Sequence, residues 1–197
     1  MRLFVGLDIA ESIRDRIRTL IDNLRQYAPN VRWVTPESLH ITFKFIGELP
    51  EARVREVESA LRAISLNSLQ VSFRSAGFFP TPRSARVFWI GIEAEPALSK
   101  LAQMVEARLE EIGIPRENRD FSPHLTLARA GSGSPTREKT DRPNQRFSRL
   151  IEYLATIPRL EFGTMTAQAF LLYRSQLSSR GSTYTKLASF ALEAQET

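Results

Sequence analysis

The chain has 197 residues but only two histidines, and both occupy the same short pattern. In "SLHITF", residues 38–43, His40 stands two places before Thr42, and in "SPHLTL", residues 122–127, His124 stands two places before Thr126. Because side chains i and i+2 of a β-strand point to the same face, each motif should present an imidazole beside a hydroxyl. One such pattern is ordinary strand composition, but its repetition around both histidines indicates a function.

Two imidazoles suit the hydrolysis of a phosphodiester without a metal ion. One would take a proton from the attacking water while the other gives a proton to the departing oxygen, and a pKa of about 6.5 lets histidine fill either role. Thr42 and Thr126 can donate hydrogen bonds to the phosphate oxygens. Arg129, five residues after His124, is the candidate cation that offsets the developing charge. The two motifs are chemically equivalent, so they do not assign the roles by themselves.

Other chemistries for two histidines fit the sequence less well. A metal site lacks a third imidazole, the chain has no cysteine, and neither motif places an acidic residue at ligand spacing. We therefore expect neither a metal nor another cofactor. A Ser-His-Asp triad needs one histidine only, and the chain has no G-x-S-x-G motif to carry the nucleophile.

The elements that must position the motifs alternate without a strict βαβ rhythm. Apolar residues recur at helical spacing within residues 11–27, 50–64 and 96–112. Apolar runs typical of β-strands occur at residues 2–7, 31–34, 39–47, 69–79, 85–92, 121–129, 165–173 and 182–192. This mixture predicts an α+β fold with mostly antiparallel sheets rather than a doubly wound one.

The stretch "ARAGSGSPTREKTDRPNQR", residues 128–146, is rich in Gly, Ser, Pro and charge and has no apolar periodicity. It predicts a mobile loop over residues 130–147. Because this segment directly follows the second motif, it is either a disordered connector or a lid over the site.

Composition sets the class of protein. With 42% hydrophobic residues the chain can bury a core as a single domain over residues 1–197. "MRLFVGLDIAES" is apolar over too few residues for a signal peptide or a membrane span. The lack of cysteine suits a reducing cytoplasm, and a net charge of +5 favours an anionic partner. We expect a cytoplasmic monomer that makes no membrane contact.

These residues resemble the two-histidine phosphoesterases, and among them the RNA 2′,3′-cyclic phosphodiesterases of the 2′-5′ RNA ligase family. The resemblance covers nearly the whole chain. "FKFIGEL" follows the first motif, "ARVFWIGI" resembles the strand before the third helix, and "HLTLAR" resembles the second motif with its arginine. "LLYRSQLSSRGSTYTKLASFAL" resembles the closing hairpin, where Ser175, Leu177, Gly181 and Tyr184 fit the pattern.

The resemblance implies a bilobal fold in which two pseudo-symmetric halves flank a central cleft, with helices outside and one motif in each half. It implies metal-independent hydrolysis of an RNA 2′,3′-cyclic phosphate to a 2′-phosphate, with weak reverse 2′-5′ ligation. His40 then corresponds to the proton donor and His124 to the proton acceptor. The phosphate would be held by Thr42, Thr126 and Arg129.

Three further residues are predicted to line the cleft. Lys44 departs from the family pattern and shares strand parity with His40 and Thr42, so it would reach the substrate backbone. Arg86 and Tyr173 are the other two. The alternative for Arg86 is a solvated charge at a strand edge, and the alternative for Tyr173 is a ring packed in the core.

Two other functions stay open. One is a related enzyme that acts on 2′-5′ oligonucleotides or on small cyclic nucleotides. The other is a noncatalytic RNA-binding module with the same cleft, against which the two intact motifs argue.

Overall fold

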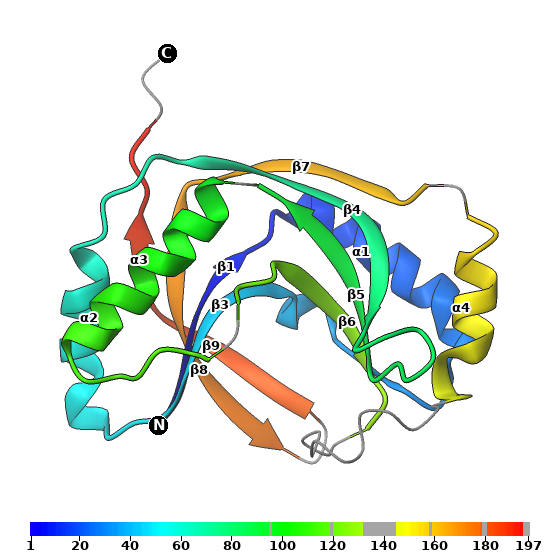
Figure 1. Cartoon of the computed structure of the whole chain (residues 1–197), viewed down its shortest axis with the longest axis horizontal. Helices are drawn as coiled ribbons and strands as arrows, with labels where there is room; N and C mark the ends of the chain where they lie inside the picture. The colour runs from blue at the N-terminus through cyan, green and yellow to red at the C-terminus, as the bar shows by residue number, and fades with distance from the viewer. Residues whose placement is uncertain (95, 119, 132–144, 158, 179–180, 195–197) are drawn as a thin grey trace.

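The computed structural model describes the whole chain except residues 95, 119, 132–144, 158, 179–180 and 195–197 (Figure 1). The helices are α1 (Glu11–Leu24), α2 (Val54–Arg62), α3 (Ala97–Glu111) and α4 (Ser148–Leu154). The strands are β1 (Arg2–Asp8), β2 (Arg32–Trp33), β3 (His40–Glu48), β4 (Leu69–Phe79), β5 (Val87–Glu93), β6 (His124–Arg129), β7 (Glu161–Ala167), β8 (Ala169–Ser178) and β9 (Gly181–Ala191). Most of the predicted loop of residues 130–147 lies outside the described residues, and its end at Gln145–Phe147 is a 3₁₀ turn.

The strands form two sheets, in the orders β3-β1-β8-β9 and β2-β6-β5-β4-β7. All neighbouring strands in both sheets run antiparallel. The expected α+β fold with mostly antiparallel sheets is therefore confirmed.

An internal repeat relates the two sheets. When β2 and β7 are left out, the order β1-α1-β3-α2-β4 in the first part of the chain recurs as β5-α3-β6-α4-β8 in the second. The sheet order β3-β1-β8 correspondingly recurs as β6-β5-β4. The third strand of each trio therefore comes from the other repeat, so neither sheet is built from one half of the sequence.

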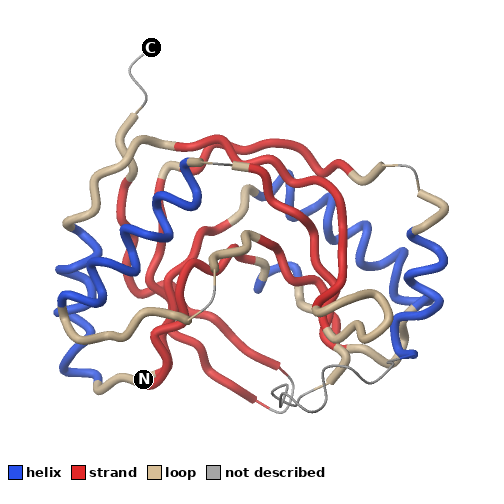
Figure 2. The backbone as a smooth tube through the Cα atoms, in the orientation of Figure 1, coloured by secondary structure: helices blue, strands red, loops and turns tan. Residues whose placement is uncertain are grey.

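Like the strands, helices pack against elements of the other repeat, and they lie outside the sheets (Figure 2). α1 follows β1 but contacts β7 of the other sheet, and Tyr27 beyond its end stacks on Tyr153 of α4 with ring centroids 4.0 Å apart. α3 follows β5 but packs on β3 and on α2. Figure 1 shows the resulting pairs, α1 with α4 at one end of the molecule and α2 with α3 at the other. None of the described helices is long and apolar enough to cross a membrane.

A β-bulge interrupts the first motif strand. Gly6 pairs with Thr42 and Val5 with Lys44, so Phe43 is an extra residue in β3. Phe43 and Lys44 are consequently both buried, where a regular strand would alternate. An extra residue reverses the face to which the side chains that directly follow it point.

The second motif strand carries a bulge at the equivalent place. Trp89 pairs with Thr126 and Phe88 with Ala128, which makes Leu127 the extra residue in β6. The buried and half-buried positions of β3 and β6 then follow the same order. In each strand the residue five places after the histidine returns to the histidine's face. That residue is Phe45 in β3 and Arg129 in β6.

Candidate active site

The two motif strands β3 and β6 come from different sheets and contact each other. His40 is the first residue of β3, and His124 is the first residue of β6. The fold therefore brings together two motifs that lie far apart in the sequence.

Each imidazole is held by a backbone carbonyl two residues earlier. Nδ1 of His40 lies 2.7 Å from the Ser38 carbonyl oxygen, and Nδ1 of His124 lies 2.8 Å from that of Ser122. Because a carbonyl only accepts hydrogen bonds, each Nδ1 carries a proton and each Nε2 is the nitrogen that exchanges protons. Sequence reasoning missed these partners, since a backbone carbonyl leaves no signal in residue type.

Aromatic rings fix the position of His40. Its ring lies 4.6 Å from that of Phe4 and 4.8 Å from that of Tyr184, the latter edge to face. Tyr173 stacks on Phe4 at 4.8 Å and is only 4% exposed. It therefore packs beside the ring that supports His40 and does not line an open surface. The ring of His124 lies 5.0 Å from that of Phe79, edge to face.

The charge of Arg129 acts on His40 across the two sheets. The pKa of His40 is lowered to about 4: burial lowers it most, the Ser38 carbonyl raises it, and the Arg129 guanidinium lowers it. Arg129 also interacts with Tyr184 of β9, while burial lowers the pKa of Arg129 itself. A residue of the second motif thus lies within electrostatic reach of the first histidine. The contact between β3 and β6 and this charge interaction together support a single site formed by both motifs.

An ionised carboxylate beside His40 was not predicted from the sequence. Asp8 pairs with His40 across the β1–β3 ladder. It accepts hydrogen bonds from Arg14 at 2.8 Å and from Lys186. Burial raises the pKa of Asp8, but Lys186 and Arg14 outweigh burial and leave the pKa below its usual value. The Asp8 charge in turn raises the pKa of His40 and partly offsets Arg129.

The prediction that Lys44 lines the site is wrong. The bulge at Phe43 turns Lys44 into the core, where its side chain is 1% exposed. Its Nζ lies 2.5 Å from Glu106 of α3 and donates a hydrogen bond to the Pro115 carbonyl at 2.8 Å. Phe45 takes the place on the His40 face that Lys44 was expected to hold, and it is 47% exposed.

Thr42 and Thr126 are half-buried on the faces of their histidines, two positions farther along β3 and β6. Arg86 is half-buried just before β5. Its backbone carbonyl accepts a hydrogen bond from the amide of Ala130 at 2.8 Å, so the residue lies beside the end of β6. Its predicted role in lining the cleft stays a prediction.

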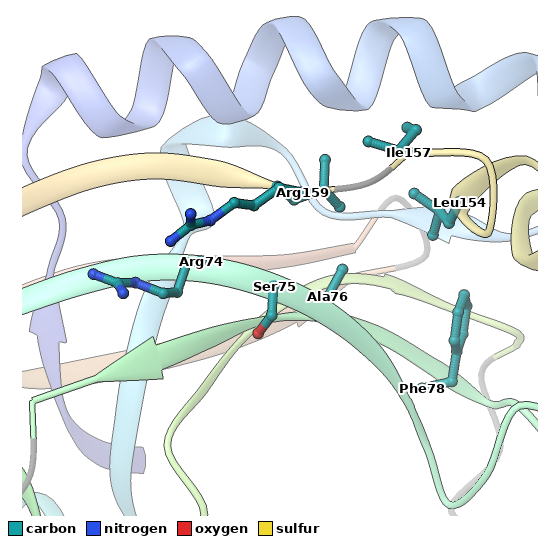
Figure 3. A pocket seen from close by; sticks show the side chains of 8 residues that line it. Arg74, Ser75, Ala76, Phe78, Leu154, Ile157 and Arg159 are labelled. Atoms are coloured by element: carbon teal, nitrogen blue, oxygen red, sulfur yellow. The ribbon is translucent and has the colours of Figure 1, made fainter.

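A cavity of about 290 Å³ lies elsewhere, between β4 and the segment that leads from α4 to β7 (Figure 3). It is lined by Arg74, Ser75, Ala76, Phe78, Leu154, Ile157, Arg159 and Leu160. None of the predicted site residues is among them. Within the described ranges, no group of three or more His, Cys, Asp or Glu side chains could hold a metal ion.

Comparison with known proteins agrees with the repeat and with the motifs. Residues 7–89 and residues 90–184 each match the LigT-like phosphoesterase family, and each match contains one histidine motif. The RNA 2′,3′-cyclic phosphodiesterase of Methanothermobacter thermautotrophicus is 32% identical over 194 residues, which cover 98% of this chain and 99% of that protein. The protein of the same name from Archaeoglobus fulgidus is 34% identical over 96% of this chain and 99% of its own length.

The crystal structure of the protein TT0787 of Thermus thermophilus has the same fold. It aligns with a TM-score of 0.78 and 27% identity over 100% of both chains. The expected two-histidine phosphoesterase fold is therefore confirmed. The chain belongs to the LigT-like phosphoesterase family.

Proposed function

We propose that this protein hydrolyses the 2′,3′-cyclic phosphate at an RNA end to a 2′-phosphate by acid-base catalysis with its two histidines. Relatives over nearly its full length are RNA 2′,3′-cyclic phosphodiesterases. One observation supports the mechanism: two imidazoles with equivalent carbonyl partners begin β3 and β6, which contact each other, and the charge of Arg129 acts on His40. A site with two histidines and a cation contains a base, an acid and a stabiliser of phosphate charge.

The proposed reaction is a displacement at phosphorus. The oxygen of a water molecule attacks the phosphorus while Nε2 of His124 takes the proton of that water. The bond between phosphorus and the 3′ oxygen breaks, and Nε2 of His40 gives its proton to that oxygen. The phosphate stays on the 2′ oxygen. The resemblance to the family supports this assignment of acid and base.

The phosphate would be held between the two strands. The hydroxyls of Thr42 and Thr126 donate hydrogen bonds to its non-bridging oxygens, and Arg129 offsets the charge that builds up on them. The exposed ring of Phe45 shares the face of His40 and offers a surface on which a base can stack.

Binding of the phosphate would also favour protonation of His40, the proposed proton donor. In the free protein the pKa of His40 is about 4, so its imidazole is neutral near pH 7. An anion bound beside it offsets the charge of Arg129 and favours the imidazolium form. His40 would therefore become a proton donor when the substrate binds.

The same groups would catalyse the reverse reaction, because acid and base exchange roles when RNA ends join through a 2′-5′ bond. We expect that ligation to be weak in water. We also propose that the protein acts as a monomer in the cytoplasm, a reducing compartment that suits a chain without cysteine.

The direct test is to incubate the protein with a short RNA that ends in a 2′,3′-cyclic phosphate, in excess EDTA, and to separate 2′- from 3′-phosphate products. We expect turnover to the 2′-phosphate. A 3′-phosphate product would contradict the assigned leaving oxygen. If the RNA is not hydrolysed, turnover of 2′-5′ oligonucleotides or small cyclic nucleotides would favour the related enzymes. RNA binding without any turnover would favour the noncatalytic module.

A further inference from the structure

A second arginine lies in line with Arg129. In the pairing of β2 with β6, Arg32 is directly opposite Arg129, and Val87 of β5 continues the same row. Residues directly opposite in an antiparallel pair project to the same face, with Cβ atoms about 4.5–5.5 Å apart. Arg32 therefore points to the face that carries Arg129.

The neighbouring residue fixes this orientation. Trp33 lies opposite the buried Ala128 and packs edge to face on the buried Phe88, with ring centroids 6.0 Å apart. Its indole nitrogen donates a hydrogen bond to the Ala28 carbonyl at 3.1 Å. Because Trp33 is anchored in the core, the side chain of Arg32 points away from the core, and it is exposed.

Like charges placed directly opposite each other in a sheet are destabilising. Some half-buried arginines of this protein pair with carboxylates, as Arg18 does with Asp15 and Arg53 with Glu56. In the part of the chain that the structure describes, no ion pair joins a carboxylate to Arg32 or Arg129. A row of two arginines without a carboxylate is the arrangement that a bound polyanion stabilises.

We propose that Arg32 binds the phosphodiester that links the terminal nucleotide of the RNA to the one before it, and so makes an RNA chain a better substrate than a cyclic mononucleotide. Arg129 lies near His40 and is committed to the reacting phosphate. Arg32 lies on the edge strand, one strand spacing farther out, where the next phosphate of the chain can reach it. This proposal rests on the proposed function, because it requires the terminal phosphate to lie between the two motifs.

The test compares two substrates that differ in the internucleotide phosphate. One is adenosine 2′,3′-cyclic monophosphate, and the other is the dinucleotide ApA that ends in a 2′,3′-cyclic phosphate. In Arg32→Gln the ratio of kcat/KM for the dinucleotide to that for the mononucleotide should fall about 5-fold at low salt, mainly through the KM of the dinucleotide. Arg32→Lys should restore part of the ratio, since it keeps the charge.

Salt dependence supplies a second readout. The slope of log kcat/KM against log salt for the dinucleotide should become shallower by about 0.7 in Arg32→Gln, as for one phosphate contact on a single strand. The matched control is Arg55→Gln, which removes the same charge from an exposed position on the outer helix α2 and should change neither the ratio nor the slope.

An unchanged substrate ratio in Arg32→Gln would overturn the proposal, whether both substrates lose activity equally or neither does. Calorimetric titration with ApA 2′-phosphate and with 2′-AMP separates this failure from a failure of the proposed function. If the wild-type protein hydrolyses neither substrate, a selective loss of ApA 2′-phosphate affinity in Arg32→Gln still supports the phosphate contact. Equal affinities in wild type and variant would overturn it.

Discussion

His40 differs from an exposed histidine because rings of Phe4 and Tyr184 enclose it and the charge of Arg129 lies close by. Both effects favour the neutral imidazole, and together they outweigh the Ser38 carbonyl and Asp8. The two motifs are equivalent in sequence, so this property of His40 comes entirely from the residues that the fold brings to it.

The lowered pKa predicts how stability depends on pH. The pKa of His40 is about 4 in the folded protein against an ordinary 6.5, so the unfolded chain binds the proton first as the pH falls. The stability that this difference provides is present above about pH 6.5 and is lost as the pH falls toward 4. This single group should lower the free energy of unfolding by about 2 kcal/mol between pH 7 and pH 5.

Urea unfolding at pH 7 and pH 5 measures this effect, with His40→Gln as the control that cannot take up the proton. The wild type should lose about 2 kcal/mol more than the variant over this range. Equal losses in the two proteins would contradict the lowered pKa.

At the scale of the element, the bulge in β3 directs the side chain of Lys44 into the core, on the opposite face from His40. Lys44 joins β3 to α3 through Glu106, whose side chain is 19% exposed. Lys44→Met should lower the free energy of unfolding by about 2–4 kcal/mol, because it leaves a largely buried carboxylate without its partner. Replacing both, in Lys44→Met with Glu106→Leu, should recover most of that stability.

Chemical denaturation measures the stability of these variants, and steady-state kinetics show whether Lys44 has any part in the site. We expect kcat/KM of the folded Lys44→Met protein to stay near that of the wild type. A variant with normal stability but a raised KM for RNA would show instead that Lys44 reaches the substrate.

The same bulges limit what strand alternation can predict. Alternation correctly implies that Ile41 is buried beside a half-buried His40 and Thr42. Beyond the bulge it fails: it directs Lys44 toward the site and would direct Arg129 away from it, and the structure reverses both. No residue type in either strand signals the extra residue, because pairing with the neighbouring strand creates the bulge.

At the scale of the whole molecule, the exchange of strands between repeats ties the two parts of the chain together. A fragment of residues 1–89 contains β1, β3 and β4 but lacks β8, which pairs with β1 in one sheet, and most of β5, which lies between β4 and β6 in the other. We expect this fragment to be unfolded alone, with narrow amide dispersion in its NMR spectrum. The full chain should unfold in one transition, with coincident far-UV circular dichroism and tryptophan fluorescence curves.

Mixing residues 1–89 with residues 90–197 is the control, since the complementary fragments should regain structure together. A well-folded fragment of residues 1–89 alone would show that the sequence repeat is also an independent folding unit.

The sequence predicts the fold class and the pairing of the two histidine motifs, but it does not predict that the two repeats exchange strands. The predicted strand at residues 165–173 spans the end of β7 and the start of β8, which belong to different sheets and are separated only by Gln168. An apolar run gives no sign of where a chain passes from one sheet to the next. The short helix α4 was also missed, and it begins just after the predicted loop.

The kcat of His40→Ala and His124→Ala on RNA 2′,3′-cyclic phosphate tests most directly whether both histidines act in one catalytic step. Each variant should fold, as judged by circular dichroism, and lose about 10²- to 10⁴-fold in kcat, the range for a lost general acid or base. The double variant should lose little more than either single one, because groups that act as a unit are not additive. Full activity in either single variant would show that the two histidines do not act together in catalysis.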